Sequence, residues 1–178
     1  MFKRQQFAAA DLPEILLVGN QRNVSSFSAE FDALRPTKAQ AGSIALADKR
    51  VLSSASHAAD VTALGEATTH DITQPAITLL TGTREEQTDL DAATAGAVNL
   101  SSWAYAAHGE LDADHYAGVL QPYRLVRVRG IGGYLSGDYL IGHVMHVLTD
   151  AGYRQRFSLH RNARSAGGAV GGIPAGVF

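Results

Sequence analysis

The amino-acid sequence predicts a mainly β protein with one minor helix. Several segments alternate apolar and polar side chains with the period of two that strands show, as in residues 25–31, 126–129 and 153–160. Segments with glycine and other turn residues separate them. Only residues 84–97 repeat apolar side chains at helical spacing. The 178-residue chain is 46% apolar and 18% charged, which is typical of a soluble domain with a hydrophobic core.

The N-terminal part is expected to begin with a β-hairpin. The apolar run at 14–18 is followed by the turn residues GNQRN and by the alternating segment 24–31. Pro36 separates this hairpin from a further predicted strand at 38–46. The proline also biases Arg35 toward an extended conformation.

The sequence is predicted to divide into four parts. Residues 1–60 are expected to be a β-rich N-terminal subdomain and residues 61–75 a connection, because the segment from 51 onward is rich in Ala, Ser and Thr without a clear period. Residues 76–163 form the second predicted module, which contains the short helix. Residues 164–178 are a tail with five glycines, which we expect to be flexible on its own.

The second module is predicted to open with a strand and a helix. Residues 76–82, AITLLTG, are a candidate strand. Thr83 and Glu86 then have the spacing of a capping box, in which a hydroxyl and a carboxylate bind free amides at a helix start. The recurrence of Leu90, Ala93 and Ala97 predicts a helix near 84–97 that packs through alanines.

The remainder of the module has the pattern of a β-meander. Strands are predicted at 100–111 and 123–130, and a final hairpin at 139–148 and 153–161, joined by the turn residues TDAG. The last strand alternates strictly, so we expect one packed face and one polar face. The packed face would hold Tyr153, Phe157 and Leu159 with Gln155, and the polar face Arg154, Arg156, Ser158 and His160.

Composition excludes several classes of protein. The chain has no cysteine, which rules out disulfide scaffolds, cysteine-ligated zinc and cysteine nucleophiles. No apolar run approaches the roughly 18–20 residues that a membrane span needs. A signal peptide is not expected, because Asp11, Pro13 and Glu14 interrupt the first apolar stretch.

His143 and His146 raise the possibility of a metal site. Two residues three positions apart share one face of a helix but point to opposite faces of a strand. The surrounding pattern favours a strand, and no HExxH motif or third ligand at a recognisable spacing accompanies the pair. We therefore predict no metal and no cofactor.

Catalytic motifs are also missing. There is no GxSxG nucleophile elbow, and Glu110, Asp112 and Asp114 fit an exposed acidic loop better than a glycosidase carboxylate pair. The segment GIGGY at 130–134 lacks the Lys-Ser/Thr of a phosphate loop and is expected to be a turn. The sequence therefore predicts a protein that is not an enzyme.

Charge is distributed unevenly along the chain. Residues 1–59 carry a net charge of +2, residues 60–116 of −9 and residues 117–178 of +5. Such a pattern is typical either of contacts in an assembly or of solvated faces. Nucleic-acid binding is not expected, because the arginines are divided between strand faces and no RNA-binding motif is present. The arginines concerned are Arg124, Arg127, Arg129, Arg154 and Arg156.

Several spaced motifs resemble those of one protein family. A strand ends near Gly130, and the steps SG-x-Y at 136–139, V-x-H at 144–146 and Y-x-Q-x-F-x-L-x-R-N at 153–162 follow it. In this order they resemble the C-terminal part of the late control protein D and VgrG-type baseplate hub family. Upstream, NVSSFSAEF and the Pro-Thr step at 36–37 resemble the same family, so the resemblance covers most of 20–163. The family-motif residues are Tyr139, His146, Tyr153, Phe157, Leu159, Arg161 and Asn162.

The resemblance implies a non-enzymatic baseplate hub component of a phage tail or contractile injection system. Such hubs form homotrimeric rings through tube-like β-barrels and link the tail tube protein to the central spike, so 76–163 would be such a barrel. The chain would be made in the bacterial cytoplasm and incorporated into the particle, without membrane or specific nucleic-acid partners. Interface or lumen candidates are Arg127, Arg129, Arg154, Arg156 and His160.

Two features differ from the family. Its members are typically longer, with an additional N-terminal half, and the glycine-rich tail matches none of the motifs. The alternative is a β-barrel module that binds a glycan or another ligand.

Overall fold

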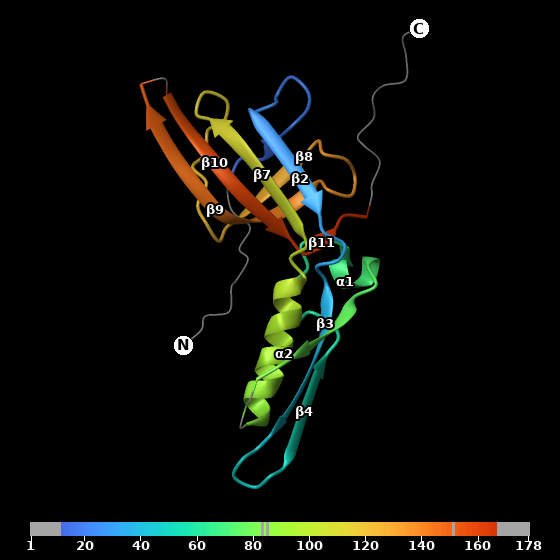
Figure 1. Ribbon diagram of the computed structural model, residues 1–178. Coiled ribbons are helices and arrows are strands. Elements are labelled where there is room, and N and C mark those ends of the chain that lie inside the picture. The colour runs from blue at the N-terminus through green and yellow to red at the C-terminus, as the bar shows by residue number, and fades with distance from the viewer. Residues whose placement is uncertain (1–11, 83, 85, 151, 167–178) are drawn as a thin grey trace. The chain divides into compact units, whose positions relative to one another are not determined.

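A computed structural model describes residues 12–82, 84, 86–150 and 152–166 of the chain. The chain forms two compact units (Figure 1). Unit 1 comprises residues 1–31, 64–66 and 105–178, and unit 2 comprises 32–63 and 67–104. The predicted fold class is confirmed, because strands dominate and one sheet curls into a half-barrel.

Unit 1 is built on a six-stranded sheet with the order β1-β8-β9-β10-β7-β2. Only β1 and β8 run parallel; the other neighbours are antiparallel. The predicted final hairpin is confirmed as β9 and β10, which pair from Gly152 opposite Thr149 onward. The strands are β1 (Ile15–Leu16), β2 (Ser26–Phe31), β7 (Tyr105–Asp112), β8 (Leu125–Arg129), β9 (Gly137–Thr149) and β10 (Gly152–Arg161), and the short β11 (Ala163–Arg164) follows.

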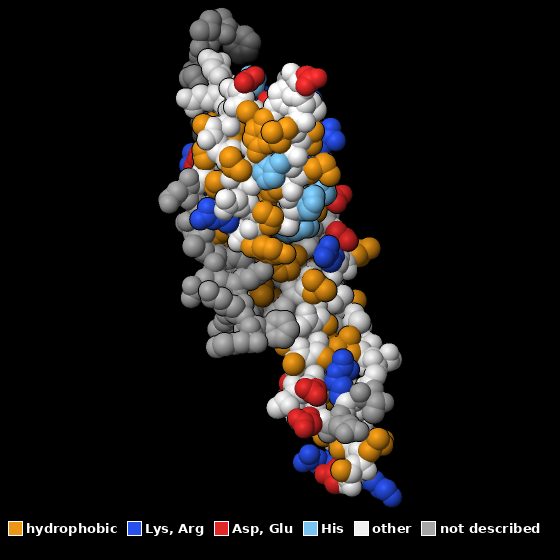
Figure 2. All heavy atoms as spheres, turned by 90° about the vertical axis from the view of Figure 1, so that its left-hand side faces the viewer, with side chains coloured by type: hydrophobic (Ala, Val, Ile, Leu, Met, Phe, Trp, Pro, Cys, Tyr) orange, Lys and Arg blue, Asp and Glu red, His pale blue; other side chains and the backbone are white. Residues whose placement is uncertain are grey.

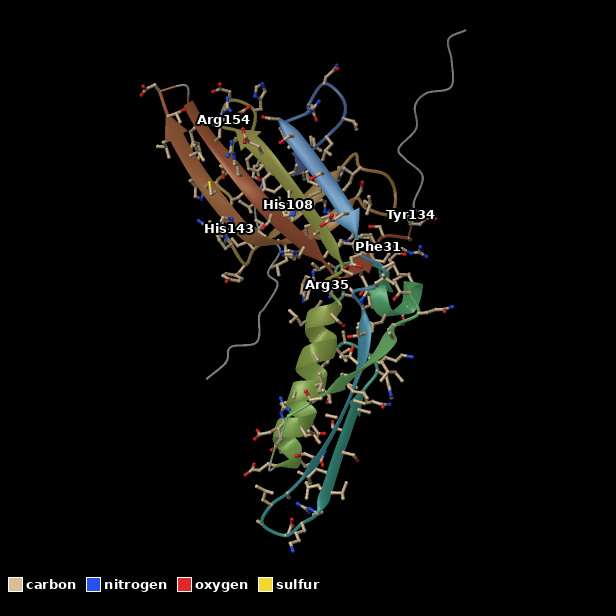
Figure 3. The ribbon with its side chains drawn as sticks, in the orientation of Figure 1. Phe31, Arg35, His108, Tyr134, His143 and Arg154 are labelled. Atoms are coloured by element: carbon tan, nitrogen blue, oxygen red, sulfur yellow. The ribbon has the colours of Figure 1, made fainter. Side chains whose placement is uncertain are left out.

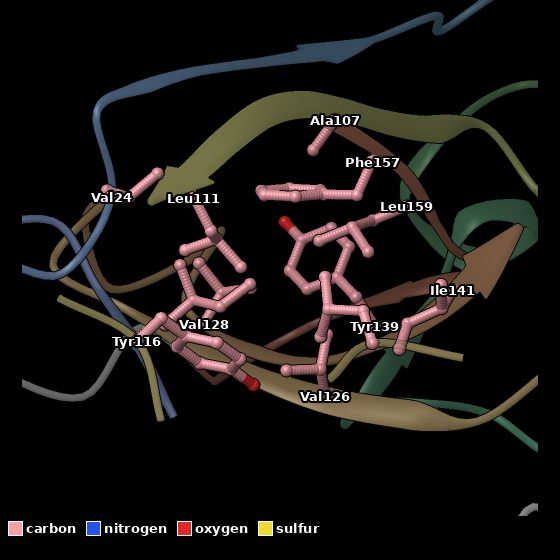
Figure 4. Packing of buried hydrophobic residues seen from close by; sticks show 12 residues of the cluster. Val24, Ala107, Leu111, Tyr116, Val126, Val128, Tyr139, Ile141, Phe157 and Leu159 are labelled. Atoms are coloured by element: carbon pink, nitrogen blue, oxygen red, sulfur yellow. The ribbon is translucent and has the colours of Figure 1, made fainter. Parts of the chain in front are cut away.

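The inner face of this curled sheet encloses the larger hydrophobic core (Figure 4). Side chains from β7, β8, β9 and β10 meet there, and Tyr116 from the loop after β7 closes one end by donating its hydroxyl proton to the Pro13 carbonyl at 2.8 Å. Burial raises the pKa of Tyr116 to about 12. Each large apolar side chain buried here contributes roughly 1.5–3 kcal/mol. Those fully buried include Leu111, Val128, Tyr139, Ile141 and Leu159.

Unit 2 is a three-stranded sheet with a helix on one face. Its order is β4-β3-β6, with β3 (Thr37–Ile44) in the centre, β4 (Val51–Ser56) antiparallel to it and β6 (Ala76–Leu80) parallel. Helix α2 (Gln87–Ser101) lies along this sheet, with Leu90, Thr94 and Val98 buried on the facing side. Leu90 packs with Ala41, Ala45 and Leu52. The unit also contains β5 (Ala67–Thr68) and the four-residue α1 (Thr69–Ile72).

The predicted N-terminal hairpin is wrong. β1 pairs with β8, and β2 pairs with β7, about 80 residues away in sequence. Asn23 lies in the loop between the two strands. Its side chain accepts a hydrogen bond from the Leu16 amide and donates one to the Glu14 carbonyl. Local alternation identified β2 correctly, but it could not specify the distant partner strand.

The helix and the second unit also differ from prediction. α2 runs to Ser101, so the first residues of the predicted strand 100–111 are helical. The predicted capping box involves Thr83, which lies outside the described residues, and the N-cap Glu86 makes no side-chain capping bond. A capping box does occur at α1, between Thr68 and Asp71. The expected connection over 61–75 contains β5 and α1, so the chain has a second, short helix within the described residues.

The compact units do not follow the predicted boundaries at 60 and 75. The chain leaves unit 1 after Phe31, returns to it briefly at 64–66 and joins it again at Tyr105, because β2 needs β7 as its partner. Unit 2 is therefore an insertion between two paired strands of unit 1. Among the helices that the structure describes, neither is long and apolar enough to cross a membrane.

Leu159→Ala tests the contribution of the half-barrel core. Leu159 is 0% exposed, so its truncation leaves a cavity and should lower the free energy of unfolding by about 2–5 kcal/mol. Leu148 lies in the same hairpin but is 77% exposed, so Leu148→Ala should change stability by less than about 0.5 kcal/mol. Urea denaturation followed by circular dichroism measures both, and equal effects would contradict this assignment of the core.

Candidate functional site: the outer face of the half-barrel sheet

The sheet of unit 1 has a packed inner face and a polar outer face, as the alternation in β10 predicts. Gln155, Phe157 and Leu159 are buried on the inner face. Arg154 and Arg156 are exposed on the outer face, where Ser158 and His160 are half-buried. Because the core fills most of the inner face, the outer face is the larger surface that this sheet offers to a partner.

Ion pairs run across β7 and β10 on the outer face. Arg156 lies opposite Glu110 in the antiparallel register and donates from Nε to its carboxylate at 2.7 Å. Arg154 lies opposite Asp112 and reaches both Asp112, at 3.2 Å, and Glu110, at 3.3 Å. Each exposed pair is worth only about 0.2–1 kcal/mol, so the network fixes side-chain geometry more than it adds stability.

Two more pairs involve arginines of β8. Arg127 makes a two-pronged contact with Asp138, with nitrogen–oxygen distances of 2.7 and 3.0 Å. Hydrogen bonding to this carboxylate raises the pKa of Arg127. Arg129 lies 2.9 Å from Glu14. All four predicted arginine candidates are thus on the outer face in ion pairs. Among these pairs, those of Arg154 and Arg156 with Glu110 and Asp112 join the acidic middle of the sequence to its basic end.

The histidines of β9 lie on opposite faces of the strand. His143 is opposite Ser158 on the outer face, whereas His146 is opposite Gln155 on the inner face near the hairpin end. His146 Nδ1 is 2.6 Å from the Tyr153 hydroxyl, and the two rings stack with centroids 5.9 Å apart. No group of three or more His, Cys, Asp or Glu side chains within the described ranges could hold a metal ion.

Further histidines lie on the outer face beside these pairs. Figure 3 marks His108 on β7 and His143 on β9, which both flank Ser158 of β10 in the register. The ring of His160 covers Gly142, where an added Cβ would be 2.7 Å from the nearest ring atom. Figure 2 shows histidine and hydrophobic side chains gathered together on one side of this unit. His108 was not predicted as a site residue. The period of two in this strand nevertheless indicates that His108 and Glu110 share one face.

A shallow depression of about 450 Å³ lies at the β2–β7–β10 side of the sheet. Gly109 is one of the residues that line it, and a Cβ there would clash with the Phe157 ring at 2.5 Å and with the Ser26 carbonyl at 2.6 Å. Phe27 packs near Phe157, with ring centroids 6.2 Å apart. The polar groups around the depression come from Ser26, Ser28, His108, Glu110 and Arg156.

A buried arginine fixes the end of the sheet that carries this face. Arg161 is 1% exposed, and its guanidinium donates to the carbonyls of Leu64 at 2.9 Å, Leu135 at 3.2 Å and Ser136 at 3.1 Å. It also donates to the Ser165 hydroxyl at 2.8 Å. These described partners are all neutral oxygens, so the charge is stabilised by hydrogen bonds rather than by a carboxylate.

Neighbouring residues complete this arrangement, which we call the arginine latch and define as Arg161, Asn162, Ser165 and Gly137. Asn162 accepts a hydrogen bond from the Leu64 amide at 2.9 Å. Gly137 has φ of +144° and leaves room for the guanidinium, since a Cβ there would be 2.6 Å from Nη2. The Tyr139 ring lies 5.4 Å from the Arg161 Cζ, and burial raises the Tyr139 pKa while Arg161 opposes that shift.

No protein-family model matches this sequence, and no curated protein matches it. Solved structures do resemble the fold. A 43 kDa tail protein of prophage MuSo2 from Shewanella oneidensis aligns with 89% of this chain and 45% of its own, with a TM-score of 0.58 and 17% identity. A tail protein from Neisseria meningitidis MC58 aligns with 85% of this chain and 44% of its own, with a TM-score of 0.51 and 10% identity.

At these identities the comparisons show a shared fold. The chain spans less than half the length of either tail protein. The aligned region nevertheless includes most of this chain.

Arg161→Lys tests the arginine latch. Lysine keeps the charge but lacks the planar set of donors, so several buried carbonyls lose their partners and stability should fall by about 2–4 kcal/mol. Arg156→Lys is the matched control, because Arg156 is an exposed arginine of the same strand, and its effect should stay below about 0.5 kcal/mol. Thermal or urea unfolding measures both variants. An Arg161→Lys protein as stable as the wild type would contradict the latch.

Proposed function

We propose that this chain is a structural component of a phage tail or contractile injection system, at the baseplate hub that links the inner tube to the central spike. The observation that carries the proposal is the fold shared over 89% and 85% of the chain with two proteins described as tail proteins. The motif series from Gly130 to Asn162 supports the same family of machines.

The geometry of unit 1 supports a role in assembly rather than in turnover. Side chains fill the inner face of the half-barrel, and the residues of the outer face are tied into cross-strand ion pairs. An ordered surface of this kind suits recognition of a fixed partner, since complementary charges select and orient partners more than they add affinity. In the proposal the protein is not an enzyme.

The proposed partners are further copies of the chain in a homotrimer, the tail tube protein and the central spike protein. Closed rings form when one patch of a subunit binds a different patch of the next and the rotation closes. The interface or lumen candidates on unit 1 remain Arg127, Arg129, Arg154, Arg156 and His160, now all assigned to β8 or β10. The proposed location is the assembled particle, after synthesis in the bacterial cytoplasm.

A binding module for a glycan is a second candidate. The depression beside Gly109 favours it, because hydroxyl, imidazole, carboxylate and guanidinium groups converge there. Selective binding on a glycan array, without any association with tail proteins, would favour this alternative.

Native mass spectrometry of the purified chain with its genomically neighbouring tube and spike proteins tests the proposal. We expect a discrete oligomer of the 18.8 kDa protomer, with three copies, and binding to at least one of the two partners. Arg154→Ala combined with Arg156→Ala should weaken partner binding about fivefold, while Arg50→Ala, an exposed arginine of unit 2, should not. A chain that stays monomeric at 50 µM (an order-of-magnitude working concentration for weak complexes) and binds neither protein would contradict the proposal.

A further inference from the structure

The sheet of unit 2 has one covered face and one uncovered face. In the strand register, Ala39, Ala41 and Leu80 lie on the side that α2 covers. The residues between them lie on the other side, which no described element of unit 2 covers. We call this the open face and define it by Lys38, Gln40, Ile44, Val51, Ile77 and Leu79.

The open face is apolar for a surface in contact with water. Four of its side chains are aliphatic and well exposed: Ile44 at 54%, Val51 at 75%, Ile77 at 56% and Leu79 at 71%. In the register, Ile77 and Leu79 lie beside Lys38 and Gln40, and the pair Ile44–Val51 lies further along the same face, beyond Gly42 and Ser53. Exposed apolar side chains that share one face in this way mark sites where proteins associate.

The edge strand β6 shows the same property. Its sequence, AITLL, contains no charged residue and no proline, and four of its five residues are exposed. Soluble proteins usually protect exposed edge strands with charges, prolines or bulges, because unpaired edges promote association. The lack of such protection indicates that this edge is covered in the functional state.

The opposite side of unit 2 has complementary charge. Asp89 is exposed on α2, and the helix contains no Lys or Arg. Asp91 is also exposed, but its carboxylate is hydrogen-bonded to Gln87 and to Ser54 of β4, so it lies toward the sheet. The open face has Lys38 as its one charged residue among those that define it. One side of the unit is therefore acidic, and the other is apolar with a positive charge.

The surface of α2 is also shaped for close approach. Gly96 is exposed in the middle of the helix, where glycine is unfavourable relative to alanine. No described atom lies within 4 Å of the position that its Cβ would occupy. Ala92 lies one turn earlier and Leu100, which is 67% exposed, one turn later. A flat, partly apolar strip thus lies beside the acidic residues.

We propose that the open face of one copy binds the outer side of α2 in a second copy of this chain. Lys38 would then face Asp89, and the aliphatic residues of the sheet would cover the Ala92–Gly96 strip. Because the two patches differ, the contact is head-to-tail and builds a ring when the rotation closes. This inference rests on the proposed function, because a tail component must assemble. It names the two surfaces through which the copies would bind each other.

Leu79→Asp tests the apolar half of this contact. The substitution places a charge among the aliphatic side chains of the open face and should weaken self-association at least about tenfold, as for a buried interface anchor. Leu34→Asp is the control, since Leu34 is 90% exposed in the same unit but lies outside both patches. Analytical ultracentrifugation gives the dissociation constants, and circular dichroism checks that both variants remain folded.

A charge exchange tests the polar half. Lys38→Glu and Asp89→Lys should each weaken self-association about fivefold, and the double variant should recover most of the loss. A mixture of the two single variants should also form mixed pairs, because residues 38 and 89 of different variants then carry opposite charges.

The outcomes separate this inference from the proposed function. If the wild type assembles and Leu79→Asp and Lys38→Glu assemble equally well, the inference is overturned while the proposed function stands. If the wild type remains monomeric with and without tube and spike proteins, the proposed function fails as well. Loss of assembly in both single variants with recovery in the double variant supports the inference.

Discussion

The hydrogen bonds of Arg161 are the constraint on which the end of the half-barrel depends. A guanidinium that is 1% exposed is stable only if its donors are satisfied, and here carbonyls from 64, 135 and 136 and the Ser165 hydroxyl satisfy them. These groups come from three separate segments of the chain. One side chain therefore fixes the returning segment 64–66, the turn before β9 and the end of β10 together.

The outer face follows from that constraint. With β10 held at its end, the register with β7 places Arg156 opposite Glu110 and Arg154 opposite Asp112. In unit 1, two acidic residues of the middle segment thus neutralise two arginines of the basic end. The charges of unit 2 are arranged differently. Its acidic helix and the apolar face of its sheet lie on opposite sides of the unit, so they do not neutralise each other.

How much the sequence could predict depends on whether the signal was local. Period-two alternation correctly predicted both faces of β10 and the opposite orientations of His143 and His146. It could not predict that β2 pairs with β7 and that unit 2 is inserted between them, because strand partners are chosen over long sequence separations. The alternation places Arg161 on the packed face. A charged residue can be buried there only because oxygens from distant segments accept hydrogen bonds from its guanidinium. The resemblance to a family singled out Arg161 and Asn162, but their contacts required the fold.

In the proposed function, the surfaces of this chain bind neighbouring proteins, and the chain occupies the hub of a tail-like particle. Cryo-electron microscopy of particles purified from the bacterium that carries this gene tests that claim most directly. The account predicts density for this chain in a threefold ring between the last tube ring and the spike. Intact tails with a complete hub and no density or peptide signal for this chain would contradict it.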